Sequence, residues 1–302
     1  DEANKRSWMH KNSLYRENFE HASCGVGMVV SIEGKPSRKV VELGIDALKA
    51  IWHRGAVDAD GKTGDGAGIH VQIPVSFFYD QIERTGHKPR KDELMAVGQV
   101  FLPRADFGAQ ETCRSIVETE VLRMGYYIYG WRHVPVKTDC LGEKANATRP
   151  EIEQILISNS KGVDQDTFER ELYVIRRRIE KSASQAGVSQ LYLASLSCRS
   201  IIYKGMMLAE QVAVFYPDLC DERFTSTFAI YHQRYSTNTF PQWWLAQPFR
   251  MLAHNGEINT LKGNVNWMKS HEIRMASSAF GEMADDIKPI IPGGSSDSAA
   301  LD

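Results

Sequence analysis

Residues 21–30, with the sequence "HASCGVGMVV", place a cysteine directly before an apolar run. Gly25 and Gly27 make the chain around Cys24 small and flexible, and residues 27–32, "GMVVSI", have the pattern of a buried β-strand. A polar stretch precedes the cysteine. Cys24 is therefore either a buried structural thiol or a nucleophile that becomes the first residue of the chain after cleavage.

The composition is that of a globular protein with a sizeable core. The chain has 302 residues, of which 42% are hydrophobic and 25% are charged. A formal net charge of −2 gives no electrostatic reason to expect a nucleic acid or an acidic membrane surface as a partner. No apolar run approaches the roughly 20 residues that a membrane-spanning helix needs. We therefore expect neither nucleic-acid binding nor membrane association.

The cysteines argue against a disulfide framework and against a metal site. There are five of them, an odd number, and no pair has the C-x-x-C spacing. We expect no zinc or iron–sulfur site within this segment. The first 23 residues lack the apolar core of a secretory signal and are too acidic for a transit peptide. These features favour a reducing, cytoplasmic location.

The periodicity of apolar residues predicts strands in groups, interrupted by a few amphipathic helices. Helices are expected within residues 35–55, with Pro36 in the first turn and Gly55 at the end, and over 107–125 and 164–184. Strands are expected over 27–32, 69–75, 94–103, 191–205 (one arm or two), 212–217 and 225–237. Because regular β–α alternation is missing, the pattern predicts an α+β fold in one domain.

A thiol attacks as the thiolate, and an ordinary cysteine pKa near 8.5 leaves little thiolate at neutral pH. A base must therefore take the proton from Cys24. The candidate histidines are His21, His53, His232 and His254. If the bond between Ser23 and Cys24 is cut, the freed α-amine, with a pKa of about 7.7–8.0, is a second candidate on the same residue.

Two polar motifs provide groups that suit the ends of an amino acid. "HQRYSTNT", residues 232–239, offers Arg234 and Thr237 just past a strand, where a guanidinium and a hydroxyl can hold a carboxylate. "GGSSDSAALD", residues 293–302, offers Asp297 at a helix start as the partner of an ammonium group. The alternatives are a surface arginine with a strand-end threonine, and a helix N-cap.

A third motif, "LAHNGEIN" at residues 252–259, contains Asn255-Gly256. The asparagine side chain and the unhindered glycine N–H are the two donors that an oxyanion hole needs. The alternative is an Asn-Gly hairpin turn. Together the three motifs and the thiol suit an amino acid that carries an acyl group at the end of its side chain, such as glutamine.

Taken together, these motifs resemble those of a known family. The motifs, in chain order, are Cys24-Gly-Val-Gly, His53-Arg54-Gly55, Thr63-Gly-Asp-Gly-Ala-Gly68, His232-Gln-Arg-Tyr-Ser-Thr237, His254-Asn-Gly-Glu-Ile-Asn-Thr260 and Ser296-Asp-Ser298. They resemble the class II glutamine amidotransferases, which are N-terminal-nucleophile (Ntn) hydrolases with a four-layer αββα sandwich of two mostly antiparallel sheets. Within that class the chain is similar to the amidotransferase domain of the glutamate synthase large (α) subunits, over residues 24–302.

The resemblance implies how the candidate residues act. Cys24 is the nucleophile and forms a thioester, while Asn255 and Gly256 form the oxyanion hole. Arg234 and Thr237 hold the α-carboxylate of glutamine. In addition, the resemblance places Arg54 near the entrance of the site, Asp297 at the α-amine of glutamine, and residues 239–245 in a loop that covers the substrate.

The resemblance also implies a domain plan, cofactors and partners. Residues 1–23 are a propeptide removed before Cys24, and residues 24–302 are an amidotransferase domain that is truncated at its C-terminal end. L-Glutamine is hydrolysed, and the ammonia passes to a downstream synthase domain that aminates 2-oxoglutarate. This segment holds no cofactor and no metal. FMN and a 3Fe-4S cluster belong to the downstream part, and NADPH, FAD and 4Fe-4S clusters to a small (β) subunit.

Two other functions remain open on the residues alone. An N-terminal-cysteine acylase would act on another amide, although the pair Arg234 and Asp297 suits a free amino acid better. A regulatory module that binds glutamine without turnover is favoured if the leader is retained, because a blocked α-amine is no base.

Overall fold

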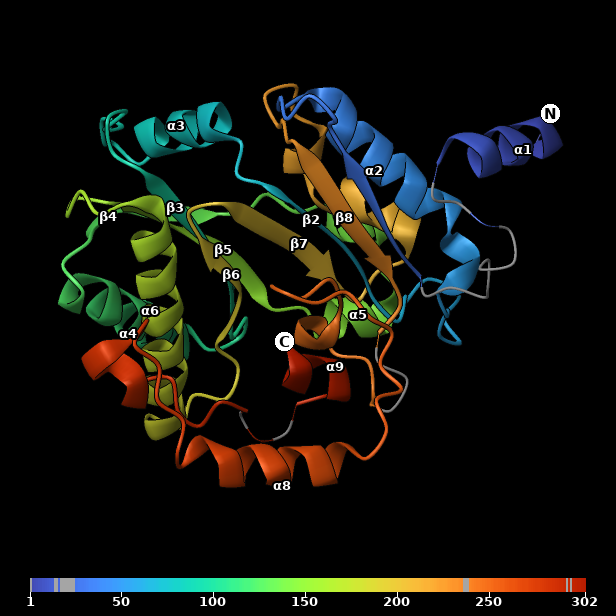
Figure 1. Cartoon of the computed structure of the whole chain (residues 1–302). Coiled ribbons are helices and arrows are strands. Elements are labelled where there is room, and N and C mark those ends of the chain that lie inside the picture. The colour runs from blue at the N-terminus through green and yellow to red at the C-terminus, as the bar shows by residue number, and fades with distance from the viewer. Residues whose placement is uncertain (1, 14–15, 17–24, 236–238, 292, 294) are drawn as a thin grey trace.

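Two sheets of four antiparallel strands form the centre of the molecule (Figure 1). The computed structural model describes residues 2–13, 16, 25–235, 239–291, 293 and 295–302. Cys24, Thr237 and ten residues of the stretch predicted to be a propeptide (1, 14, 15 and 17–23) lie outside the described residues.

The first sheet contains the strand that follows Cys24. Its order is β1 (Val26–Val30), β8 (Phe228–Gln233), β2 (Ala67–Gln72) and β7 (Ser200–Gly205). The long-range pairing Val26↔His232 places the start of β1 beside the end of β8. His232 also pairs with Gly68 of β2, which in turn pairs with Lys204 of β7. Four segments that are far apart in the sequence therefore meet at one end of this sheet.

The second sheet has the order β4 (Tyr127–His133), β5 (Glu151–Ser158), β3 (Met95–Leu102) and β6 (Tyr192–Ser197). All eight residues of β3 are buried, because both faces of the strand are covered. Val97 and Phe101 point to the core shared with the first sheet, whereas Ala96 and Val100 point to the helices on the other side. The alternation of side chains along one strand thus serves two separate cores.

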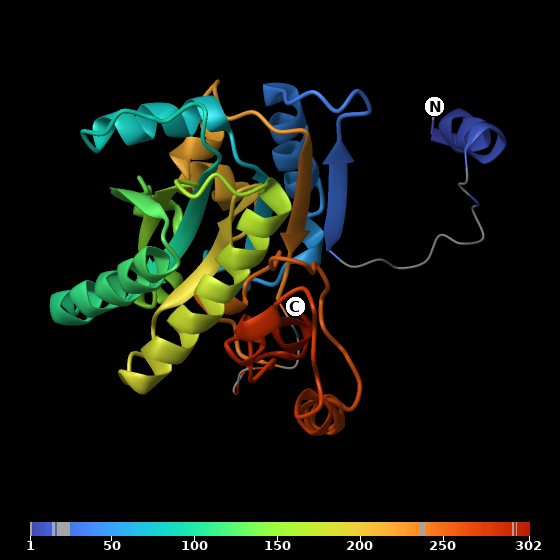
Figure 2. The same cartoon turned by 60° about the vertical axis from the view of Figure 1, so that its left-hand side comes forward.

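Helices cover the outer face of each sheet (Figure 2). α2 (Arg38–Ala50) packs on β1 and β8 and buries Val41, Ile45 and Leu48. α4 (Phe107–Arg123) and α6 (Gln165–Gln185) cover the second sheet. The structure confirms the predicted α+β class and is consistent with the four-layer αββα sandwich that the resemblance implies.

The remaining helices are short or peripheral. They are α1 (Glu2–Asn12), α3 (Val75–Arg84), α5 (Glu143–Ala147), α7 (Val212–Phe215), α8 (Leu261–Glu272) and α9 (Asp297–Leu301). The 3-10 turns are η2 (Trp52–Arg54), η3 (Thr138–Cys140), η4 (Ala209–Gln211), η5 (Pro217–Cys220), η6 (Trp243–Leu245) and η7 (Gly281–Asp285). Among the described residues, no helix has the length and apolar character that crossing a membrane requires.

The predicted strand over 212–217 is wrong. These residues form the helical turn α7, followed by η5 from Pro217 onward. A short run of buried apolar residues does not distinguish a strand from one turn of helix, because both bury it fully. The predicted 191–205 stretch is two strands, β6 and β7, and they belong to different sheets.

Several predicted boundaries also shift. The first predicted helix begins at Arg38, because Ser37 caps it by accepting the Val40 N–H. Pro36 therefore precedes the helix, and the prediction that it lies in the first turn is wrong. It ends at Ala50, and η2 then occupies the residues before Gly55. The last predicted strand ends at Gln233, four residues early, because Arg234 has a φ of 121° and leaves the extended conformation.

Gly68 marks a place where the backbone of another segment crosses β2. A Cβ atom at residue 68 would lie 2.6 Å from the Cβ of Lys204 and 2.7 Å from the backbone oxygen of Gln247. Neither neighbour is the free end of a flexible side chain. The segment around Gln247 can therefore lie on the sheet only because residue 68 has no side chain.

We predict that Gly68→Ala lowers the free energy of unfolding by about 1–3 kcal/mol, because the added methyl group overpacks the crossing. Gly108→Ala is the control: it lies in the first turn of α4, and its Cβ would meet only Asp106 Oδ1, at 3.4 Å. This control should be neutral or stabilising. Denaturant unfolding of both variants measures the difference, and equal stability would contradict the close crossing.

Candidate functional site

The site lies where β1 begins and β8 ends. The Gln233 N–H donates to the Gly25 carbonyl at 2.6 Å. A Cβ atom on Gly25 would lie 2.1 Å from the Gln233 oxygen and 3.3 Å from the Arg54 Cβ. Gly25 is therefore enclosed by β8 on one side and by η2 on the other. Cys24, the predicted nucleophile, directly precedes this residue in the chain and lies outside the described residues.

Arg234 occupies the first position after β8 and is held in an unusual backbone conformation. Its φ of 121° is rarely adopted by residues with a side chain. The Arg234 N–H donates to the Gly66 carbonyl at 2.7 Å, which fixes this turn. Its Nε is buried and has no hydrogen-bond partner among the described residues. The half-buried guanidinium therefore has capacity to bind a carboxylate.

The Asn255-Gly256 pair lies in an irregular stretch, with no strand on either side over residues 252–258. The alternative of a hairpin turn is therefore wrong. Gly256 is buried with a φ of 89°, a conformation that favours glycine, and its N–H donates to His254 Nδ1 at 3.0 Å. The Asn255 Oδ1 atom is buried without a hydrogen-bond partner in the described part of the chain.

Asp297 is tied to this same stretch. Its Oδ2 accepts the Ile258 N–H at 3.0 Å, and its Oδ1 accepts the Ser298 N–H at 2.7 Å. The side chain is only 1% exposed. Asp297 is not the N-cap of α9, because Ser296 caps this helix by accepting the Ala299 N–H. Figure 1 shows α9 beneath the end of the sheet at which β8 ends.

The predicted covering loop is anchored at its C-terminal end. Phe240 is exposed, but Trp243 is buried and donates its indole N–H to the Ala145 carbonyl at 3.0 Å. The carbonyl of Trp244 accepts a hydrogen bond from the buried Lys204 Nζ at 2.9 Å. Thr237, predicted to bind the α-carboxylate together with Arg234, lies outside the described residues.

The predicted histidine bases differ in their surroundings. His53 is exposed, and His21 lies outside the described residues. His232 is completely buried, and burial lowers the pKa of its imidazole to about 4, so the ring is neutral at physiological pH. Its Nδ1 lies 3.1 Å from the Arg234 carbonyl. The His254 ring is engaged by the Gly256 N–H, as described above.

Asp65 is a site residue for which the sequence pattern predicted no role. It lies in the Gly-rich motif of residues 63–68, is 6% exposed, and neither carboxylate oxygen has a hydrogen-bond partner among the described residues. Burial raises the pKa of this carboxyl to about 6, against the opposing effect of the Arg234 charge. The sequence feature that could have identified Asp65 is an acidic residue between two glycines at the start of a buried strand.

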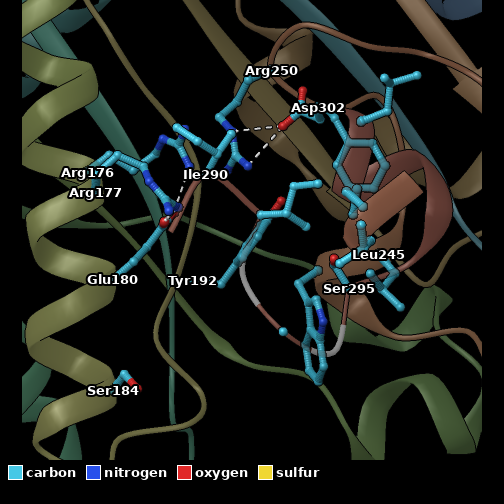
Figure 3. Close-up of a pocket in the computed structure, with 18 of the residues that line it drawn as sticks. Arg176, Arg177, Glu180, Ser184, Tyr192, Leu245, Arg250, Ile290, Ser295 and Asp302 are labelled. Carbon is cyan, nitrogen blue, oxygen red and sulfur yellow. Dashed lines mark hydrogen bonds and ion pairs between the residues drawn. The ribbon is translucent and has the colours of Figure 1, made fainter. Parts of the chain in front are cut away.

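A cavity of about 790 Å³ extends from Asp297 toward α6 and α8. Figure 3 shows two ion-paired groups on its wall. Arg250 contacts Asp302 with an Nε–Oδ2 distance of 3.1 Å, and Arg176 contacts Glu180 at 2.6 Å. Among the described residues, no cluster of three or more histidine, cysteine or acidic side chains suits a metal ion.

Comparison with known proteins places these features in a family. The family model described as "Glutamine amidotransferases class-II" matches residues 24–302. The glutamate synthase [NADPH] large chain of Azospirillum brasilense is 66% identical over 290 residues, which cover 96% of this chain and 19% of the relative. The corresponding large chain of Bacillus subtilis is 43% identical, over 96% of this chain and 19% of the relative.

The chloroplastic ferredoxin-dependent glutamate synthase of Spinacia oleracea is also 43% identical, over 94% of this chain and 18% of the relative. The chain thus spans about a fifth of the length of the curated relatives it matches.

We predict that the buried Asp65 makes stability depend on pH. In the folded chain Asp65 keeps its proton up to about pH 6, whereas an unperturbed aspartate loses it near 3.8. Between these values the folded state binds the extra proton, so the free energy of unfolding falls as pH rises. Asp65→Asn does not ionise. Its stability relative to the parent chain should therefore rise from about pH 4 to pH 6 and then stay level.

Denaturant unfolding at a series of pH values measures this difference. A difference that is constant from pH 4 to pH 7 would contradict the raised pKa of Asp65. The comparison cancels the titration of the other groups, because they are common to both chains.

Proposed function

This chain belongs to the class II glutamine amidotransferases, and from that premise we propose that it hydrolyses L-glutamine to glutamate and ammonia through the Cys24 thiol. The observation that carries the proposal is a series of contacts around the start of β1. Gly25 bonds the residue before Arg234, and His232, which pairs with Val26, is influenced by His254 and Asn255. Three polar features therefore belong to this end of the first sheet or to the segment that reaches it. They are the guanidinium of Arg234, the Asn255-Gly256 stretch and the buried carboxylate of Asp297. A cation and an anion at separate points suit the two charged groups of a free amino acid.

The proposed reaction proceeds through a thioester. The free α-amine of Cys24 takes the thiol proton, and the thiolate attacks the carboxamide carbon of glutamine. The C–N bond breaks as the amine returns that proton to the leaving nitrogen, which departs as ammonia. Water, deprotonated by the same amine, then attacks the thioester carbon and releases glutamate and the thiol.

The surrounding residues orient the substrate and stabilise its charge. We assign the α-carboxylate of glutamine to Arg234 and Thr237, and the α-amine to Asp297. Asn255 Nδ2 and the Gly256 N–H are proposed to stabilise the tetrahedral oxyanion. The Gly256 N–H must then turn from His254 Nδ1 toward the substrate, or be shared between them. Arg54, whose Cβ lies beside Gly25, is placed at the entrance.

We further propose the domain plan that the resemblance implies. Residues 1–23 are removed, and residues 24–302 belong to the amidotransferase domain; the family match begins at residue 24, which supports this boundary. In the longer protein, ammonia passes to a synthase domain that aminates 2-oxoglutarate with FMN and a 3Fe-4S cluster. The 66% identity to the NADPH-type large chain of Azospirillum brasilense supports NADPH as the electron source, through a small subunit with FAD and 4Fe-4S clusters. A cytoplasmic location is part of this proposal.

We predict that the leader must be removed for activity. While Ser23 is joined to Cys24, the nitrogen of Cys24 is an amide and cannot accept a proton. Three purified forms test this: one with the leader, one with a single residue before Cys24, and one that begins with Cys24. Only the last should release ammonia from glutamine at a substantial rate. Equal activity with one extra residue would exclude the α-amine as the base and favour a histidine.

We also predict that substitutions in the oxyanion hole and in the carboxylate clamp affect different kinetic constants. Asn255→Ala should lower kcat by about 10²–10³-fold with little change in KM, because its amide acts on the developing oxyanion. Arg234→Lys should mainly raise KM, because an ammonium group cannot make the planar, bidentate contact of a guanidinium with a carboxylate. Steady-state glutaminase kinetics distinguish these results. An Asn255→Ala effect confined to KM would remove Asn255 from the oxyanion hole.

A further inference from the structure

One buried side chain, Gln247, makes a two-point contact with the backbone that leads into Asn255-Gly256. Its Oε1 accepts the His254 N–H at 2.7 Å, and its Nε2 donates to the His254 carbonyl. Gln247 is 0% exposed. A single amide thus satisfies both backbone groups of His254, as a neighbouring β-strand would in a sheet. No regular secondary structure performs this role, because residues 252–258 are irregular.

Ser298, from a separate element of the fold, contacts the same backbone. Its hydroxyl donates to the His254 carbonyl at 3.0 Å, and the residue is fully buried in α9. The neighbouring Asp297 accepts the Ile258 N–H, as described above. The stretch from His254 to Ile258 is therefore held at both ends, and Asn255-Gly256 lies between the two holding points.

Gln247 is itself fixed on a rigid support. Its backbone oxygen lies over Gly68 of β2, where a Cβ atom would come within 2.7 Å of it. Just upstream, the Trp244 carbonyl is bound by Lys204 Nζ of β7. Lys204 is completely buried and also contacts the Tyr192 hydroxyl at 3.0 Å. The first sheet therefore fixes the backbone position from which the Gln247 side chain extends.

We propose that Gln247, assisted by Ser298, is a positioning residue that sets the oxyanion hole. The inference rests on the proposed function, because it assumes that Asn255 and Gly256 stabilise an oxyanion. Such donors must be fixed before the reaction begins, since their advantage over water is that they need no reorganisation. In an irregular segment that rigidity has to come from side chains, and Gln247 supplies two of the bonds.

The principal test is Gln247→Leu, which keeps much of the volume and removes both hydrogen bonds. In the complete, mature protein we expect kcat for glutamine to fall about 10–10²-fold while KM stays within about twofold. Alkylation of Cys24 by iodoacetamide should keep its parental rate, because displacement at a methylene carbon builds no oxyanion. This combination separates oxyanion positioning from damage to the nucleophile or to the substrate clamp.

Gln211→Leu is the matched control. Gln211 is also a buried glutamine whose amide bridges backbone groups, but these groups lie outside the site. Its Nε2 donates to the carbonyls of Lys62 at 3.0 Å and Cys140 at 2.6 Å, and its Oε1 accepts the Leu208 N–H at 2.8 Å. This variant should lose thermal stability to at least the same extent as Gln247→Leu and keep the parental kcat.

Ser298→Ala is the second variant and covers the case in which Gln247→Leu does not fold. It should lower kcat about 3–10-fold with KM unchanged. Where both fold, the double variant should lose less than the product of the single losses, because both donors serve one carbonyl. A parental kcat in both single variants would overturn the proposal, as would a loss of kcat in Gln211→Leu of the same size. Absence of glutaminase activity in the parent protein would instead reject the proposed function.

Discussion

Close backbone crossings at glycine are the constraint on which the site depends. Gly25 lies against the backbone of Gln233, Gly66 lies beneath Ala246, and Gly68 lies beneath the carbonyl of Gln247. At Gly25 and Gly68 the crossing leaves no room for a Cβ atom, and at Gly66 a φ of 148° disfavours a side chain. Each crossing brings a different part of the chain to the end of the first sheet. Without them, the residues before β1, after β8 and around 246–256 could not share one small volume. The glycines of the motif at 63–68 are thus explained by packing, without a phosphate or another ligand.

Local sequence patterns predicted many of the helices and buried strands, because each has its own periodicity of apolar residues. The face formed by Phe168, Leu172, Ile175 and Ile179 predicted α6 almost to its ends. The strand at 94–103 was found as β3, but its central place in a second sheet was not, because β4 and β5 were not identified. The run at 212–217 was misassigned because its burial is the same for a strand and for a helical turn.

The site was predicted only in part, and the reason is physical. Arg234, Asn255, Gly256 and Asp297 carry chemistry that residue type reveals, and their motifs could be read singly. Gln247 and Asp65 have significance only through contacts with distant backbone and charged groups, which no local pattern encodes. The positive φ of Arg234 is similar: it follows from the bond to Gly66, a residue far away in the sequence.

The buried carboxylate of Asp297 bears on which amide the site accepts. It is 1% exposed and accepts two backbone N–H groups, from Ile258 and Ser298. A buried carboxylate favours a ligand that brings a positive charge over a ligand that offers neither a charge nor a hydrogen bond. A fatty acyl amide carries no ammonium group, whereas glutamine brings one. Because Asp297 also holds the Ile258 N–H next to Asn255-Gly256, the group proposed to select an amino acid and the groups proposed to stabilise the oxyanion belong to one hydrogen-bonded segment. This arrangement favours glutamine hydrolysis over the acylase alternative.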